Sequence, residues 1–69
     1  MRRDEIPLRE RESWTLEEWG ALHGYSRSFA YKLRAQGKTP RELRVGRTNR
    51  ITRAADAEWR QRMEGAEAA

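Results

Sequence analysis

The chain has 69 residues, 38% of them charged and 36% hydrophobic, with a formal net charge of +4, so it has room for one domain with a small core. The absence of cysteine and the single histidine exclude a disulfide framework and a metal site built from these residue types. No apolar run approaches the roughly 20 residues of a membrane-spanning helix, and no apolar stretch of an export signal follows the first residues.

Residues 1–12 alternate in charge and contain few aliphatic side chains. A segment with so little to bury is predicted to be a flexible charged arm. An edge strand over residues 9–12 is the alternative. Arg2 and Arg3 could contact DNA phosphates as part of a flexible arm. The favoured interpretation is that they are ordinary charged residues of a chain terminus.

The first helix is predicted to begin at Thr15. Thr15 and Glu18 have the spacing of a capping box, in which the threonine hydroxyl accepts from the Glu18 N–H and the glutamate accepts from the Thr15 N–H. Trp14 and Trp19 flank this box at the positions of a hydrophobic staple. Two independent start signals therefore coincide at one residue.

An apolar stripe at Leu16, Trp19 and Leu22 predicts that one face of this helix is buried. Gly24 tolerates the left-handed conformation that ends a helix, so the helix has only about two turns. His23, in the last turn, is interpreted as a polar residue that the helix dipole favours when protonated.

A second helix is predicted over residues 27–36, with Ser26 as its N-cap and with Ala30 and Leu33 on its buried side. The short connection makes the two helices cross steeply, and Gly20 and Ala30 are small enough to allow the close approach. This arrangement is a helix-turn-helix, whose second helix would enter the DNA major groove. The alternative is an ordinary helical bundle.

The exposed side of the second helix has the residue types that contact DNA. Arg27 is suited to guanine edges, Ser28 to a base or a phosphate, and Tyr31 and Lys32 to phosphates. Phe29 either packs against the following hairpin or contacts a thymine methyl, and packing is favoured because exposed phenylalanine is uncommon. The predicted DNA-binding residues of this helix are Ser26, Arg27, Ser28, Tyr31 and Lys32.

A two-stranded hairpin is predicted over residues 43–52, after Pro40 prevents the helix from continuing. Leu43 and Val45 are predicted to point inward, and residues 46–49 to form the turn. Arg47 and Arg50 would then lie at the tip, where a narrow minor groove favours arginine. The predicted DNA-binding residues of this wing are Arg44, Arg47, Thr48, Asn49 and Arg50.

Thr52 is predicted to cap a third helix, in which Ala55, Trp59 and Met63 share one face and Trp59 closes the core. Residues 64–69 are predicted to be a disordered acidic tail. No arrangement of nucleophile and base is found along the chain, and we expect no enzymatic activity, cofactor, metal or small-molecule ligand.

Basic charge is confined to one part of the chain. Residues 27–53 carry a net charge of +8, whereas the remaining residues carry −4. A generic solvated surface mixes its charges, so this segregation is typical of a face that binds phosphates. The basic residues of the segment are Arg27, Lys32, Arg34, Lys38, Arg41, Arg44, Arg47, Arg50 and Arg53.

The order of these elements resembles the excisionase-like, MerR-related family of winged helix-turn-helix DNA-binding domains. The resemblance extends from about residue 14 to residue 63, and the chain departs from the family pattern at Trp19, His23, Phe29 and Asp56. The matching residues are Trp14-Thr15-Leu16-Glu17-Glu18, Gly24-Tyr25-Ser26-Arg27-Ser28, Ala30-Tyr31-Lys32-Leu33, Arg44-Val45-Gly46-Arg47, Arg50-Ile51 and Trp59.

The resemblance implies a mainly α fold with a small β-hairpin, in which three short helices and a two-stranded wing form one DNA-binding domain over residues 13–63. It implies a cytoplasmic, sequence-specific binder of double-stranded DNA, in a bacterium or a phage-infected cell. An excisionase that bends attachment-site DNA, with an integrase and neighbouring copies of itself as further partners, is the leading role. A small transcriptional regulator of the same fold is the first alternative. The second is a protein–protein adaptor, such as a packaging or antitoxin subunit, that would use Trp14, Phe29 and Trp59 as an apolar contact surface.

Overall fold

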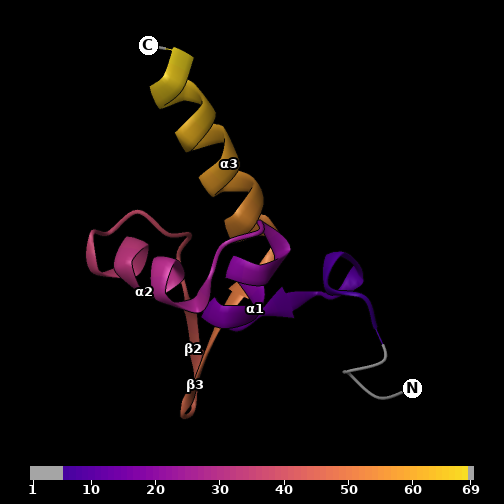
Figure 1. Cartoon of the computed structure of the whole chain (residues 1–69). Helices are drawn as coiled ribbons and strands as arrows, with labels where there is room; N and C mark the ends of the chain where they lie inside the picture. The colour runs from indigo at the N-terminus through magenta and orange to yellow at the C-terminus, as the bar shows by residue number, and fades with distance from the viewer. Residues whose placement is uncertain (1–5, 69) are drawn as a thin grey trace.

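The computed structural model describes residues 6–68; residues 1–5 and 69, and with them the predicted phosphate contacts of Arg2 and Arg3, lie outside the described part. Within residues 6–68 the chain forms a small α/β domain of three α-helices and a three-stranded antiparallel sheet in the order β1-β3-β2 (Figure 1). The elements in chain order are a 3₁₀ turn η2 (Leu8–Glu10), β1 (Ser13–Trp14), α1 (Leu16–Leu22), α2 (Arg27–Ala35), β2 (Leu43–Val45), β3 (Thr48–Thr52) and α3 (Arg53–Ala68).

Helix α1 begins as the capping box predicts. The Thr15 hydroxyl accepts from the Glu18 N–H at 3.1 Å, and the Glu18 carboxylate accepts from the Thr15 N–H at 2.9 Å. Trp14 and Trp19, the two staple residues, are both buried in the core. Local hydrogen bonds and the first long-range packing thus begin at the same place in the chain.

Helices α1 and α2 approach closely at Gly20 and Ala30, as predicted. A Cβ added to Gly20 would lie 3.0 Å from the Ala30 Cβ, which is tighter than ordinary packing. Gly24 turns the chain between the helices with a φ of 78°, a conformation that glycine adopts without steric cost. The Ser26 hydroxyl then caps α2 by accepting from the Phe29 N–H at 3.1 Å.

The sheet contains one strand more than the predicted two-stranded wing. β1 pairs with the end of β3, with Ser13 opposite Thr52 and Trp14 opposite Ile51. The β2–β3 turn is also shorter than predicted. Only residues 46–47 form it, with Gly46 at a φ of 60° in the first central position, as in a type II′ turn. Thr48 and Asn49 belong to β3 rather than to the turn.

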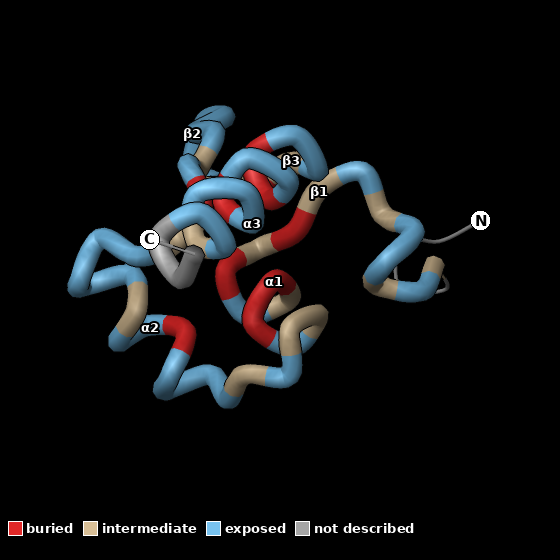
Figure 2. The backbone as a smooth tube through the Cα atoms, turned by 90° about the horizontal axis from the view of Figure 1, so that it is seen from above, coloured by how far each residue is buried: buried red, intermediate tan, exposed pale blue. Residues whose placement is uncertain are grey.

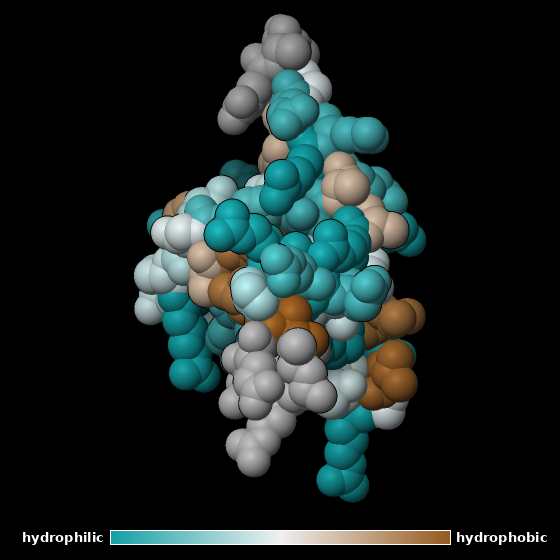
Figure 3. Space-filling view, turned by 90° about the vertical axis from the view of Figure 1, so that its right-hand side faces the viewer, coloured by the Kyte–Doolittle hydropathy of each residue, from teal (hydrophilic) through white to brown (hydrophobic). Residues whose placement is uncertain are grey.

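The predicted inward orientation of Leu43 and Val45 is wrong. Both side chains lie largely in solvent, with exposed fractions of 54% and 58%. Their cross-strand partners are Arg50 and Thr48, so they share the outer face of the sheet, whereas Ile51 on the alternate face packs into the core. Apolar surface is accordingly visible at the height of the hairpin in the space-filling view (Figure 3).

The core lies between α1, the β1–β3 pair and the first half of α3, whereas most of α2 is exposed (Figure 2). Trp59 closes this core as predicted, because its ring meets that of Trp19 edge-on, with centroids 4.9 Å apart, and its Nε1 donates to the Lys38 carbonyl at 2.8 Å. The buried hydrophobic residues are Trp14, Leu16, Trp19, Ala30, Ile51, Ala55 and Trp59.

Residues 6–12 have defined partners in the structure, where the sequence predicted a flexible arm. The Trp14 Nε1 donates to the Leu8 carbonyl at 2.6 Å, and the Arg53 guanidinium donates to the carbonyls of Arg9 and Arg11, each at 2.9 Å. At the other end, α3 continues to Ala68 over residues for which a disordered tail was predicted, and its last turns project away from the other elements (Figure 1). Within the described residues, no helix combines the length and apolar character needed to span a membrane.

Candidate nucleic-acid interface

Helix α2 presents a polar face to solvent. Arg27, Ser28, Tyr31 and Lys32 are all exposed, and Ala30 is the buried residue of the helix (Figure 2). The observed bounds of α2 differ by one residue from the predicted range of 27–36, since Gln36 is the C-cap. The side chains predicted to face DNA from this helix are therefore accessible.

Two residues of the predicted α2 contact set already have hydrogen-bond partners within the protein, and a third contacts one of them. The Ser26 hydroxyl is the acceptor of the helix cap. The Tyr31 hydroxyl donates to the Glu17 carboxylate at 2.7 Å, and the guanidinium carbon of Arg27 lies 5.8 Å from the centroid of the Tyr31 ring. These contacts link the exposed face of α2 to the first turn of α1.

The prediction that Phe29 packs against the hairpin is wrong. Its ring contacts Tyr25 edge-on, with centroids 5.1 Å apart, and 43% of the residue remains exposed. The reason is helical geometry: the flank of α2 that borders the hairpin carries Tyr31 and Arg34, and Phe29 lies on the other flank. Its exposed edge is continuous with the polar face of α2.

An open groove separates α2 from the hairpin. Its wall on the α2 side contains Tyr31 and Arg34, and its wall on the hairpin side contains Thr48 and Asn49. Glu17 and Glu42 also line it, and the Glu42 carboxylate pairs with Arg34 at 3.0 Å. The structure thus brings the two predicted contact elements to the two sides of one concave surface.

The predicted hairpin residues fall into two groups. Arg44 and Arg47 are exposed, and Arg47 lies in the turn itself. Asn49 is half-buried, and the Thr48 hydroxyl donates back to the Val45 carbonyl at 2.8 Å, which braces the turn. Four of the five predicted wing residues therefore lie in or beside the distal end of the hairpin.

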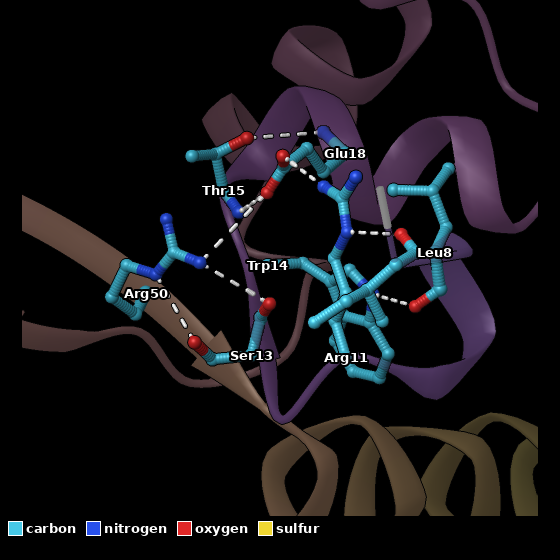
Figure 4. Close-up of polar contacts among 8 residues, drawn as sticks. Leu8, Arg11, Ser13, Trp14, Thr15, Glu18 and Arg50 are labelled. Atoms are coloured by element: carbon cyan, nitrogen blue, oxygen red, sulfur yellow. Dashed lines mark hydrogen bonds and ion pairs between the residues drawn. The ribbon is translucent and has the colours of Figure 1, made fainter. Parts of the chain in front are cut away.

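Arg50 is the exception, because it points toward the base of the hairpin rather than its tip (Figure 4). Its Nε donates to the Ser13 hydroxyl at 3.1 Å and its Nη2 to the Ser13 carbonyl at 3.2 Å, while the Glu18 carboxylate lies 3.9 Å away. The Arg50 side chain is only 20% exposed. It holds β3 to β1 and to the capping box of α1.

The same capping carboxylate also holds the N-terminal segment. Arg11 donates from Nη1 to the second Glu18 oxygen at 2.6 Å and from Nε to the Ile6 carbonyl at 2.9 Å. Glu18 is thus the common partner of the helix start, the N-terminal segment and the hairpin base (Figure 4). The orientation of the hairpin is consequently tied to α1.

Several cations of the basic segment have no acidic partner within residues 6–68, whereas Arg34 and Arg41 are paired with Glu42 and Glu58. Solvated cations of this kind are the groups that phosphates neutralise, with release of counterions. The cations of this segment without an acidic partner in the described part are Arg27, Lys32, Lys38, Arg44, Arg47 and Arg53, the last of which donates to the carbonyls of Arg9 and Arg11.

A buried polar cluster around Asp56 was not predicted. Asp56 accepts from Trp19 Nε1 and from His23 Nε2, each at 2.9 Å, and from Arg60 Nε at 3.0 Å. Burial raises the pKa of this carboxyl, but the hydrogen bonds from His23 and Trp19 and the Arg60 charge outweigh burial and lower the pKa below its ordinary value.

His23, interpreted from the sequence as a polar residue in the last turn of the first helix, is the C-cap of α1 and packs into this cluster. Its side chain is 15% exposed and its ring lies among Trp19, Tyr25 and Trp59. The available signal was Asp56 itself, an acid directly after the predicted core position Ala55. An acid there requires buried donors, and Trp19 and His23 supply them.

Residues 6–68 contain no group of three or more histidine, cysteine or acidic side chains that could hold a metal ion. The arrangement of a solvated basic helix face, an open groove and an arginine-bearing hairpin is suited to binding a polyanion.

Comparisons with protein families, with curated proteins and with solved structures found no match to this chain.

Proposed function

We propose that this protein is a sequence-specific, double-stranded-DNA-binding protein of the winged helix-turn-helix type, with α2 in the major groove and the β2–β3 hairpin in the adjacent minor groove. The observation that carries this proposal is the placement of solvated cations, Arg27 and Lys32 on α2 and Arg44 and Arg47 on the hairpin, on the two elements that border one groove. Neutralisation of DNA phosphates by such cations supplies essentially all of the non-specific affinity of DNA-binding proteins and a large share of their specific affinity.

Helix α2 is suited to the major groove because its exposed face is free of core side chains. A major groove about 12 Å wide admits one α-helix, and residues near the N-terminal end of that helix reach the base edges. Arg27 and Ser28 occupy the first turn of α2, where they would contact bases, and Lys32 lies one turn later, where it would contact a phosphate.

The hairpin is suited to the minor groove because its turn is narrow and cationic. Arg47 occupies the two-residue turn with Gly46, which adds no side-chain bulk beside it. Insertion of arginine into a narrow minor groove is favoured by the strong negative potential there. Arg44, on the adjoining strand, would follow the phosphate backbone.

The role that the resemblance supports best is that of an excisionase, which would bend attachment-site DNA together with neighbouring copies and an integrase. A transcriptional regulator with the same mode of DNA binding is the alternative. The adaptor hypothesis loses most of its predicted surface, since Trp14 and Trp59 are buried and only Phe29 of its three residues is exposed.

The test is selection of bound duplexes from a randomised DNA pool at near-physiological salt, followed by affinity measurements over a range of salt concentrations. We expect one enriched motif. Arg27→Ala should relax the preference at one position of that motif, with a loss of about 1–3 kcal/mol in discrimination. Arg47→Ala should weaken binding to all duplexes and reduce the salt dependence by about one counterion.

Enrichment of no motif would contradict sequence-specific recognition. Repeats of the motif clustered at an attachment site would support the excisionase role, whereas an isolated motif at a promoter would support the regulator.

A further inference from the structure

A chain of two contacts among three residues leads from α1 to the proposed base-reading arginine. The Glu17 carboxylate accepts the hydrogen bond of the Tyr31 hydroxyl at 2.7 Å, and the Tyr31 ring lies 5.8 Å from the guanidinium carbon of Arg27. All three residues are exposed, so none of these contacts is needed to fill the core.

The first contact fixes the tyrosine ring. Glu17 belongs to the first turn of α1, directly after the capped start at Thr15, so its backbone is held by the helix. A tyrosine on the surface of a helix otherwise changes rotamer freely, but a hydroxyl bonded to a second helix restricts the ring to one orientation. Because the bond joins α1 to α2, the ring position follows the relative placement of the two helices.

The second contact restricts the arginine. An exposed arginine samples many rotamers, and ordering it on binding has an entropic cost. A guanidinium within about 6 Å of an aromatic centroid is attracted to the ring, which favours the rotamers that place Arg27 along Tyr31. A fixed ring therefore gives the guanidinium a preferred position before DNA arrives.

We propose that Glu17 and Tyr31 are positioning residues that hold the Arg27 guanidinium in the orientation that reads a base, an inference that rests on the proposed function. Tyr31 then acts on base preference through Arg27 rather than as a phosphate contact, since its hydroxyl proton is already donated to Glu17. Glu17 acts only as the hydrogen-bond acceptor for Tyr31, and its negative charge is not needed to position Arg27.

Four substitutions separate the acceptor, the charge and the hydroxyl. Tyr31→Phe keeps the ring and removes the bond, Glu17→Ala removes acceptor and charge, and Glu17→Gln keeps an acceptor oxygen without the charge. Tyr25→Phe is the matched control, because it removes a tyrosine hydroxyl that has no hydrogen bond within the described residues, and because Tyr25 lies with His23 and Trp59 rather than along the groove between α2 and the hairpin.

The measurement is the dissociation constant for a duplex changed at the single position where Arg27→Ala loses its preference, divided by the dissociation constant for the preferred duplex. We expect Tyr31→Phe and Glu17→Ala to lower this ratio by roughly twofold to twelvefold, the range that corresponds to immobilising one long side chain on binding. Glu17→Gln should tighten binding to both duplexes equally and leave the ratio unchanged. Tyr25→Phe should change neither the two dissociation constants nor their ratio. Thermal unfolding midpoints check that each variant is folded.

An unchanged ratio in folded Tyr31→Phe would overturn the positioning role, and so would an equal loss of the ratio in Tyr25→Phe. A wild-type protein that selects no motif would overturn the proposed function as well. The two failures are distinguishable, because in the first case the wild type still selects a motif and Arg27→Ala still relaxes it.

Discussion

Substitution of Asp56 by alanine is expected to remove most of the stability of this domain. The three donors that lose their acceptor differ in their access to water. Trp19 is fully buried, so its Nε1–H would have no partner, whereas 53% of the Arg60 side chain is exposed and its guanidinium would be solvated. His23, at 15% exposure, is intermediate.

The expected loss follows from these exposures. An unsatisfied buried donor costs about 1–3 kcal/mol, and a hydrogen bond to a charged group contributes about 1.5–3 kcal/mol. Since Arg60 adds little, Asp56→Ala should lower the free energy of unfolding by about 2–4 kcal/mol. A core of this size supplies only roughly 3–5 kcal/mol, so the variant should be largely unfolded or close to it at 25 °C.

Equilibrium unfolding in urea, followed by tryptophan fluorescence and circular dichroism, measures this loss. Glu58→Ala is the control on the same helix, because its ion pair with Arg41 is exposed and such pairs contribute about 0–1 kcal/mol. A loss below about 1 kcal/mol for Asp56→Ala would mean that water reaches Trp19, and the reasoning would be refuted.

Three further outcomes are expected. The native pKa of Asp56 lies below its ordinary value, so its stabilising contribution is present above about pH 4 and is lost as the pH falls through the native pKa. The difference in unfolding free energy between wild type and Asp56→Asn should therefore shrink in acid. A difference independent of pH would contradict the lowered pKa. Gly20→Val should destabilise by about 1–3 kcal/mol in urea unfolding because the Cβ has no room, whereas Gly65→Ala, with nothing near its Cβ, should not. Arg50→Ala should lower the free energy of unfolding by about 1–2 kcal/mol because its hydrogen bonds to Ser13 are lost, and Arg47→Ala should lower it by less than about 0.5 kcal/mol. Equal effects would mean that the Arg50 hydrogen bonds do not stabilise the domain.

Local sequence signals predicted the helices well. The capping box at Thr15, the cap at Ser26 and the glycine at position 24 each act within a few residues of the chain, and all three are present in the structure. The close approach of Gly20 to Ala30 was also predictable, because a short connection between helices leaves few crossing geometries.

Contacts between distant segments were not predictable in this way. β1 has only two residues, and it is a strand only because Ile51 and Thr52 pair with it from far along the chain. The orientation of Leu43 was mispredicted for a related reason: alternation gives the two faces of a strand, but the packing of the neighbouring Ile51 decides which face is buried.

The sequence predicted which residue types form the candidate site, but not which of their side chains are already engaged within the fold. The solvated positions of Arg27, Lys32, Arg44 and Arg47 agree with the predicted accessibility of these side chains. Arg50 was assigned to the tip because the turn was predicted two residues too long. A basic pattern cannot distinguish an arginine that binds a ligand from one that braces the fold.

The single buried residue of α2 has a consequence for how this protein can change. Because Ala30 is the buried side chain among the nine residues of the helix, the outward positions Ser28, Lys32 and Ala35 have no role in the core. A library randomised at these three positions would keep the framework while varying the surface that meets the ligand. New binding preferences should therefore be selectable from this scaffold at little cost in stability, with α2 serving as an exchangeable module.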